Sequence, residues 1–159
     1  MHRSCALISF FLASAAVAVP TLTPADRAAA FKAAGFALKG KQWRSDCEDP
    51  GTASYSPGAI EPVADLNGDG LPEAVVTEGG TFCYGDTGTG FTLVSKQANG
   101  GWKIITGDTG IPNFLKTKGV AGWPDIEIGG PGFCFPVQRW NGKTYEPVRF
   151  QYEGKPCKP

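Results

Sequence analysis

The feature that most constrains the fold is a pattern that occurs twice, about fifty residues apart. In each copy an apolar residue, a proline and a carboxylate lead directly into a short apolar segment. The two copies read Leu71-Pro72-Glu73-Ala74-Val75-Val76 and Trp123-Pro124-Asp125-Ile126-Glu127-Ile128. An aromatic-Cys-aromatic triplet follows each copy, and then two apolar segments joined by an Asn-Gly turn. This internal repeat predicts two related structural units, over about 63–106 and 119–151, that bury their apolar faces together.

The apolar segments are short and are separated by Gly and Pro, which is typical of antiparallel β structure. The chain has 22 Gly among its 159 residues, about twice the usual share of roughly 7%. The predicted strands are 73–77, 81–84, 91–96, 102–105, 126–128, 133–139 and 145–151. The sequence therefore predicts a mainly β fold, built from two antiparallel units that are blade-like or form a small sandwich.

Two other regions have their own patterns. Residues 41–62 are rich in Asp, Ser, Pro and Gly and are predicted as a loop that includes, at most, a short strand near Trp43. Asp86 and Asp108 each lie in a Gly-Asp-Thr-Gly tetrapeptide. Both tetrapeptides are predicted as tight turns in which the Asp side chain bonds its own backbone.

One helix is predicted, at about 24–34. Thr23 is suited to cap it, Pro24 fits its first position, and Asp26 suits its positive end. A run rich in alanine follows until Gly35, which is expected to end the helix. Phe31 and the alanines beside it predict an apolar face that packs on a sheet.

The first residues predict export. A positive start, a short apolar run and the small residues Ala16-Val17-Ala18 describe a signal peptide over residues 1–18. The run is too short for a membrane span, which needs roughly 20 apolar residues. We therefore expect a single domain over 19–159, in the periplasm or outside the cell. Its nearly equal numbers of basic and acidic residues argue against nucleic acid as the partner.

The histidine and cysteine counts narrow the chemistry. The only histidine, His2, lies in the predicted signal peptide, so the exported chain has no Ser-His-Asp or Cys-His nucleophile pair. Four cysteines follow the predicted signal peptide, and an even number in an exported domain predicts two disulfides. Of the three possible connectivities, we favour the one that ties each chain end to its nearer β segment. The favoured pairs are Cys47 with Cys83 and Cys134 with Cys157.

The stretch before the first repeated strand is the strongest candidate site. Oxygen-bearing side chains recur at its positions 1, 3, 5 and 9, with glycine at position 6, a spacing that suits calcium. The predicted ligands are the side chains of Asp65, Asn67, Asp69 and Glu73 and the carbonyl of Leu71. An EF-hand is excluded because its twelfth position would be Val76, which lies in a β-rich run. The alternative is that this stretch is only a polar hairpin turn.

This stretch resembles the FG-GAP and VCBS type of calcium loop, which leads into a strand in integrin-like β-propeller blades. The resemblance covers residues 65–77 and, as a degenerate strand only, residues 123–129. It implies calcium ligation by Asp65, Asn67, Asp69 and Glu73. A complete propeller needs four or more blades, whereas this chain has about two. The layout also resembles small exported bacterial proteins.

Three functions remain open from the sequence. The first is a non-catalytic module that recognises a protein or glycan of the cell envelope, for example as an inhibitor of an envelope hydrolase. Its candidate binding residues are the aromatic Trp123, Trp140 and Tyr145, of which Trp123 ranks first because Gly and Pro surround it. The second is a glycoside hydrolase using carboxylates alone, with Asp125 or Glu127 beside Glu78. The third is a purely structural envelope protein.

Overall fold

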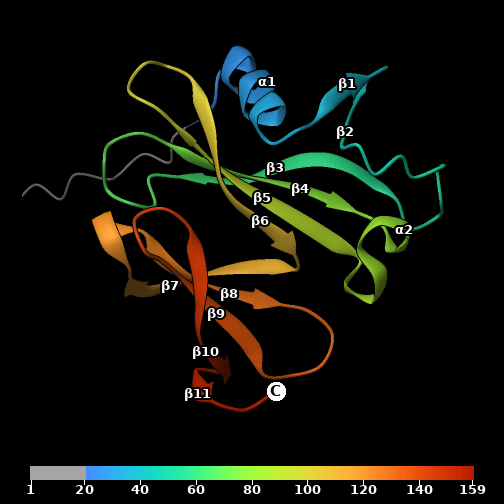
Figure 1. Ribbon diagram of the computed structural model, residues 1–159. Helices are drawn as coiled ribbons and strands as arrows, with labels where there is room; N and C mark the ends of the chain where they lie inside the picture. The colour runs from blue at the N-terminus through green and yellow to red at the C-terminus, as the bar shows by residue number, and fades with distance from the viewer. Residues whose placement is uncertain (1–20) are drawn as a thin grey trace, which may run out of the picture.

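The computed structural model describes residues 21–159, apart from the side chains of Pro62 and Val63. The predicted signal peptide lies outside the described residues. The fold is mainly β, as predicted, and its sheets are antiparallel (Figure 1). The helical elements are α1 (Pro24–Ala33), α2 (Thr81–Tyr84), and the 3-10 turns η1 (Gly85–Thr87) and η2 (Val120–Gly122). The strands are β1 (Ala37–Lys39), β2 (Gln42–Arg44), β3 (Ser56–Ala64), β4 (Glu73–Gly79), β5 (Thr89–Lys96), β6 (Trp102–Thr109), β7 (Ile111–Lys118), β8 (Pro124–Gly129), β9 (Phe135–Trp140), β10 (Tyr145–Tyr152) and β11 (Lys155–Pro156).

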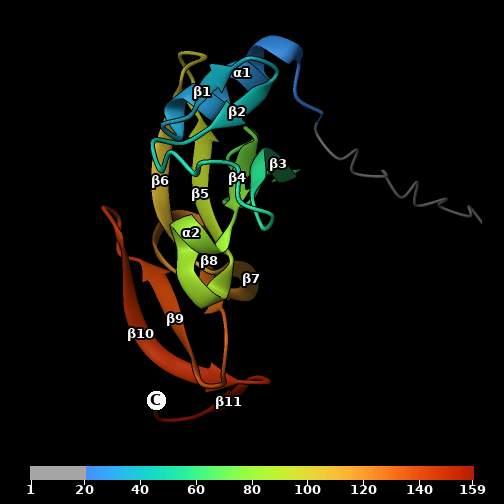
Figure 2. The same ribbon diagram turned by 90° about the vertical axis from the view of Figure 1, so that its right-hand side faces the viewer.

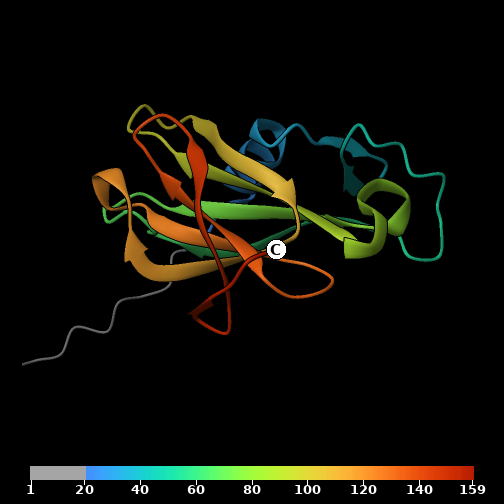
Figure 3. The ribbon, with the colours of Figure 1, turned by 60° about the horizontal axis from the view of Figure 1, so that its bottom comes forward.

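Each of the two repeated units forms one antiparallel sheet. The first sheet has the strand order β3-β4-β5-β6 and the second β11-β10-β9-β8-β7. Each therefore contains a four-stranded meander, in which β4, β5 and β6 correspond to β8, β9 and β10. The second sheet lies below the first in Figure 1 and in front of it in Figure 3. Helix α1 and the β1–β2 hairpin cover the opposite side of the first sheet, and Figure 2 shows this order from the side.

The first strand of each meander, β3 or β7, was not among the predicted strands. Both lie at the edge of their sheets, and both contain proline: Pro57 and Pro62 in β3, and Pro112 in β7. Proline has no backbone N–H to donate to a neighbouring strand, so it is tolerated at an edge but reads as a loop signal in a sequence. These two strands were therefore missed for the same reason.

Helix α1 begins and ends as predicted. The hydroxyl oxygen of Thr23 accepts the N–H of Asp26 at 3.1 Å, which caps the first turn. The helix lies across the first sheet, where Ala30 and Phe31 are buried against Val76, Val94 and other residues of the sheet. The Phe31 ring also stacks on Trp43 of β2, with 4.7 Å between centroids.

The second core lies between the two sheets. Val75, Phe91 and Leu93 from the first sheet pack there against Trp123, Ile126, Ile128 and Tyr145 from the second unit. Leu93 and Ile126 are both completely buried. Burial of a side chain of this size stabilises a fold by about 1.5–3 kcal/mol. The packing of the two sheets against each other therefore contributes to the stability of both.

Two predicted local structures are wrong. Residues 81–84 form the short helix α2 rather than a strand, because Gly80 and Gly85, both with positive φ, bend the chain at either side. Residues 107–109 belong to β6, and only Gly110 (φ +149°) turns the chain into β7. The Asp108 side chain does accept the backbone N–H of Thr109, so the predicted bond from this side chain to the neighbouring backbone is present. The turn at 85–88 is confirmed as η1 followed by a left-handed glycine.

Both predicted disulfides are confirmed. Cys47 is bonded to Cys83, with 5.9 Å between the Cα atoms, and joins the β2–β3 connection to α2. Cys134 is bonded to Cys157, with 5.6 Å between the Cα atoms, and joins the β8–β9 connection to the C-terminal segment. Within residues 21–159, no helix has the length and apolar character needed to cross a membrane.

Candidate functional site

The acidic loop between β3 and β4 is held by bonds from side chains to backbone. The carboxylate of Asp65 accepts three backbone N–H groups, from Gly68 at 2.7 Å, Asp69 at 3.1 Å and Gly70 at 2.9 Å. The Asp69 carboxylate accepts the N–H of Leu71 at 2.8 Å. Gly68 and Gly70 both have φ of +84°, which glycine adopts without steric strain. The regular spacing of acids and glycines thus produces a tightly wound loop.

Glu73 lies behind this loop rather than on it. Its side chain is fully buried, and its two oxygens accept the backbone N–H of Leu66 at 2.7 Å and the hydroxyl of Ser95 at 2.8 Å. Burial raises the pKa of the Glu73 carboxyl, the nearby carboxylates of Asp69 and Asp65 raise it further, and the two hydrogen bonds oppose this. Glu73 therefore fastens the start of the loop to the sheet.

The donor atoms of the loop fit a calcium ion only in part. In the described part of the chain, no three His, Cys, Asp or Glu side chains are grouped closely enough to hold a metal ion. Two carboxylates, Asp65 and Asp69, remain at the exposed side of the loop, together with the amide oxygen of Asn67. This set contains only oxygen donors, as calcium prefers. Glu73 would have to give up a hydrogen bond to join it, so the calcium site stays a prediction.

The acidic loop packs against the corresponding segment of the second unit. Gly122, in η2, has φ of +78°, and a Cβ atom placed there would collide with the carbonyl oxygen of Asn67. The backbone of the loop therefore rests directly on η2. Val120, at the start of η2, is exposed and lines a surface groove. The acidic loop therefore contacts η2, and η2 in turn contributes Val120 to the groove.

Asp125 occupies the position in the second unit that Glu73 occupies in the first, but its partners differ. It is fully buried, and its oxygens accept two bonds from Arg139, both 2.8 Å, one from Arg149 at 3.0 Å and one from Thr117 at 2.6 Å. The Arg139 guanidinium holds the pKa of the Asp125 carboxyl well below its ordinary value, even though burial acts in the opposite direction. In the second unit, therefore, arginines neutralise the buried acid.

The three candidate aromatic residues do not share one exposed surface. Trp123 and Tyr145 are 7% and 6% exposed and belong to the core between the sheets. Trp123 is therefore not the exposed loop residue that its Gly and Pro neighbours suggested. The Tyr145 hydroxyl donates to the carbonyl of Pro124 at 2.8 Å. Trp140 is only half-buried, and its ring lies 5.8 Å from Trp123 and 5.4 Å from Tyr145.

Trp140 forms part of an open groove of about 520 Å³ on the second unit. Val120 and Val148, 53% and 50% exposed, supply further apolar surface. The charged residues Lys118, Arg139 and Glu146 also line it. An apolar patch with polar residues around it is the usual anatomy of a protein interface, and tryptophan is enriched at its centre.

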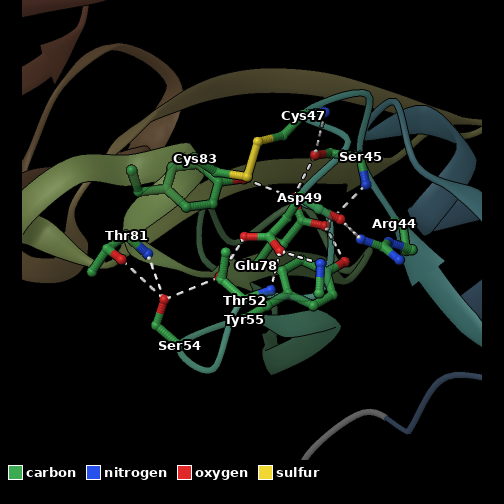
Figure 4. The surroundings of a disulfide bond; sticks show 12 residues. Arg44, Ser45, Cys47, Asp49, Thr52, Ser54, Tyr55, Glu78, Thr81 and Cys83 are labelled. Atoms are coloured by element: carbon green, nitrogen blue, oxygen red, sulfur yellow. Dashed lines mark hydrogen bonds between the residues drawn. A yellow bond between two sulfur atoms is a disulfide. The ribbon is translucent and has the colours of Figure 1, made fainter.

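Glu78 is the centre of a buried network that the sequence did not predict (Figure 4). Its carboxylate accepts bonds from the Ser45 N–H at 3.1 Å, the Ser45 hydroxyl, the Tyr55 hydroxyl at 2.8 Å and the Tyr84 hydroxyl at 2.9 Å. Burial, and then the bond to Glu78, raises the pKa of Tyr84 to about 12. The donors come from distant parts of the chain, so no local pattern marks them. The Cys47–Cys83 disulfide, which does have a sequence signal, lies beside them.

The carboxylates suggested for a hydrolase have separate surroundings. Glu78 is bonded to Ser45, Tyr55 and Tyr84 of the first sheet and its connections. Asp125 and Glu127 are bonded to residues of the second sheet, Glu127 through Asn113 at 3.2 Å and Gln151 at 2.6 Å. The hydrogen-bond partners of Glu78 thus include none of those that surround the other two acids.

Comparisons of the chain with protein-family models, with curated proteins and with solved structures found no match, so the functional assignment depends on the site itself.

Proposed function

We propose that this chain is an exported, calcium-binding β-repeat protein of the FG-GAP/VCBS-like type, and that it works as a non-catalytic recognition module. Its partner is a protein of the cell envelope, which the module binds through the groove around Trp140. The observation that carries this proposal is the groove itself, with a half-buried tryptophan, two exposed valines and charged residues of both signs. A glycan partner is the competing outcome of the test below.

The buried carboxylates support a binding function over a hydrolytic one. Glu73, Glu78 and Asp125 are the most buried acids named by the sequence analysis, and each accepts two or more hydrogen bonds from protein groups. A general acid or base must reach a substrate atom at hydrogen-bond distance. These acids instead direct their oxygens to the protein, which favours a structural role for them.

The proposal gives calcium an indirect role. The acidic loop rests on η2 at Gly122, and η2 presents Val120 to the groove. An ion held by Asp65 and Asp69 would stiffen the loop and so fix the position of Val120. Calcium would then improve binding of the partner without contacting it. The two disulfides support the exported location, because disulfides persist in oxidising compartments.

The partner-binding experiment is a pull-down from an envelope fraction, with the protein immobilised. We expect a protein to be retained in calcium and lost with a chelator, and its retention to fall about 30-fold or more in Trp140→Ala, as for a central interface tryptophan. Because Trp140 also packs on Trp123 and Tyr145, Val148→Glu tests the groove through an exposed residue instead. Phe133→Ala, at a 73% exposed aromatic residue that does not line the groove, is the control. If the unmodified protein and the three variants retain the same amount of the partner, the proposal is wrong. If only a glycan is retained, the partner is a glycan and not a protein.

Calcium binding is tested separately by titration calorimetry. We expect one site, lost in Asp65→Ala and in Asp69→Ala and retained in Asp86→Asn, where an exposed acid outside the loop is changed. Bound calcium should also raise the melting temperature of the unmodified protein, because a ligand that binds only the folded state stabilises it. An absence of heat at millimolar calcium rejects the calcium site, while the groove remains testable through Val148→Glu.

A further inference from the structure

The turn between β9 and β10 contains an asparagine followed by a glycine, and this residue, Asn141, lies in the lining of the groove. Asparagine is thermolabile, above all before glycine, which has no side chain to hinder attack by its own backbone nitrogen. We propose that Asn141 is a site of spontaneous deamidation, which converts a neutral residue of the groove into a carboxylate. This modification is a property of the turn and does not depend on the proposed recognition function.

The reaction uses only the two residues and water. The backbone nitrogen of Gly142 attacks Cγ of Asn141, and its proton passes through water to the amide nitrogen of the side chain, which leaves as ammonia. The product is a succinimide ring. Water then opens the ring: cleavage of the bond between Cγ and nitrogen gives aspartate, and cleavage of the bond between the backbone carbonyl carbon and nitrogen gives isoaspartate. Each modified residue thus consumes a water molecule and releases an ammonia molecule.

The attacking nitrogen distinguishes this Asn-Gly pair from the two others in the chain, Asn67-Gly68 and Asn99-Gly100. The N–H of Gly68 donates to the carboxylate of Asp65 at 2.7 Å, and the N–H of Gly100 donates to the carbonyl of Gln97 at 2.8 Å. A hydrogen-bonded N–H must give up its acceptor before the nitrogen can attack, which has a cost. The N–H of Gly142 has no acceptor among the described residues, so its nitrogen can attack without that cost.

The turn also activates the carbon that is attacked. The side-chain oxygen Oδ1 of Asn141 accepts the backbone N–H of Lys143 at 2.8 Å and that of Thr144 at 3.0 Å. Negative charge develops on this oxygen as the nitrogen adds to Cγ, and backbone donors already aimed at such an oxygen stabilise the transition state, as in an oxyanion hole. In the described part of the chain, the Oδ1 atoms of Asn67 and Asn99 each accept a single backbone N–H. Asn141 therefore combines a free nucleophile with the better-supported oxyanion.

The two products change the groove in different ways. Aspartate keeps a side-chain oxygen for the N–H groups of Lys143 and Thr144, so the turn is retained and a negative charge is added to a lining that already contains Glu146. Isoaspartate routes the main chain through the former side chain, so both bonds to Oδ1 are lost and the turn becomes longer by a carbon atom. Either product makes the lining of the groove more acidic.

The test follows all three Asn-Gly pairs in one sample of the full chain. The folded protein is incubated in warm, mildly alkaline buffer with a chelator and then digested, and the peptides are quantified by mass spectrometry against synthetic aspartate and isoaspartate standards. We expect Asn141 to deamidate about three- to tenfold faster than Asn67 or Asn99, as when no hydrogen bond has to be broken first. In urea with a reductant, where the chain is unfolded, the three rates should become similar. The proposal is overturned if Asn141 is no faster in the folded protein, or if the rates keep the same ratio in urea.

One variant tests whether the hydrogen bond of the glycine nitrogen sets the rate. Asp65→Ala removes the acceptor of the Gly68 N–H, so it should speed deamidation of Asn67 about threefold or more and leave the rate at Asn141 unchanged. Asn113, which precedes Phe114, is the internal control and should remain unmodified throughout. If Asn67 reacts at the same rate in Asp65→Ala and in the unmodified protein, the free nitrogen of Gly142 gives Asn141 no advantage and the proposal is wrong.

Discussion

The contact between the acidic loop and η2 can be tested by adding a single methyl group. Gly122→Ala places a Cβ atom against the carbonyl oxygen of Asn67, at a residue whose φ is +78°. Two costs are expected. An alanine in a left-handed conformation costs about 1–2 kcal/mol, and forcing a group into a packed site costs about another 1–3 kcal/mol. We therefore expect a loss of about 2–5 kcal/mol in the free energy of unfolding.

The control isolates the contact from the backbone strain. Gly100, in the β5–β6 turn, has φ of +83°, and a Cβ atom there would have no neighbour within 4 Å. Gly100→Ala should therefore cost only the backbone term, about 1–2 kcal/mol. The two variants and the unmodified protein are compared by urea denaturation, with equal slopes required for the comparison. If Gly122→Ala and Gly100→Ala are destabilised equally, the loop does not rest on η2, and the proposed link from calcium to the groove fails with it.

Two further predictions concern the buried acid of the second unit and the disulfides. Because the pKa of Asp125 is lowered in the folded protein, its ion pairs contribute stability above the ordinary Asp pKa of about 4, and this contribution is lost as the pH falls below that value. Urea midpoints between pH 2 and 6 should therefore fall less steeply in Asp125→Asn than in the unmodified protein, and parallel curves would contradict this. Replacing Cys47 and Cys83 by Ser opens a link across 36 residues and should cost about 4 kcal/mol, while the same change at Cys134 and Cys157, across 23 residues, should cost about 3.5 kcal/mol. Denaturation of the two double variants measures both losses in the free energy of unfolding. If removing one disulfide causes no loss of stability, that disulfide does not constrain the unfolded chain.

The sequence predicted those parts of the fold that depend on neighbouring residues. The cap of α1 needs only Thr23 and Asp26, and the inner strands follow from apolar runs bounded by Gly and Pro. The disulfide pairs were also predicted, from the simple expectation that each end of the chain is tied to its nearer β segment. The edge strands β3 and β7 were missed because their prolines, harmless at an edge, resemble loop signals.

The surroundings of the candidate sites could not be predicted in the same way. Trp123 has Gly and Pro beside it, which favours an exposed loop, and Trp140 has Arg and Asn, yet Trp123 is buried between the sheets whereas Trp140 lines a groove. Which of them is exposed depends on how the second sheet packs on the first. The Glu78 network likewise joins Ser45, Tyr55 and Tyr84 through contacts across the fold. Burial and long-range contacts of this kind are properties of tertiary structure.

The repeated acids give an electrostatic reason to expect a cation at the first loop. Glu73 and Asp125 are both fully buried at the same place in their units. On β9 the second unit supplies Arg139, which binds Asp125 directly, whereas on β5 the first unit supplies Ser95, which carries no charge. The raised pKa of Glu73 and the lowered pKa of Asp125 reflect this difference. Asp65 and Asp69 add negative charge near Glu73 without adding a positive group. A calcium ion bound by the loop would therefore give the first unit the positive charge that the second unit builds from its own arginines.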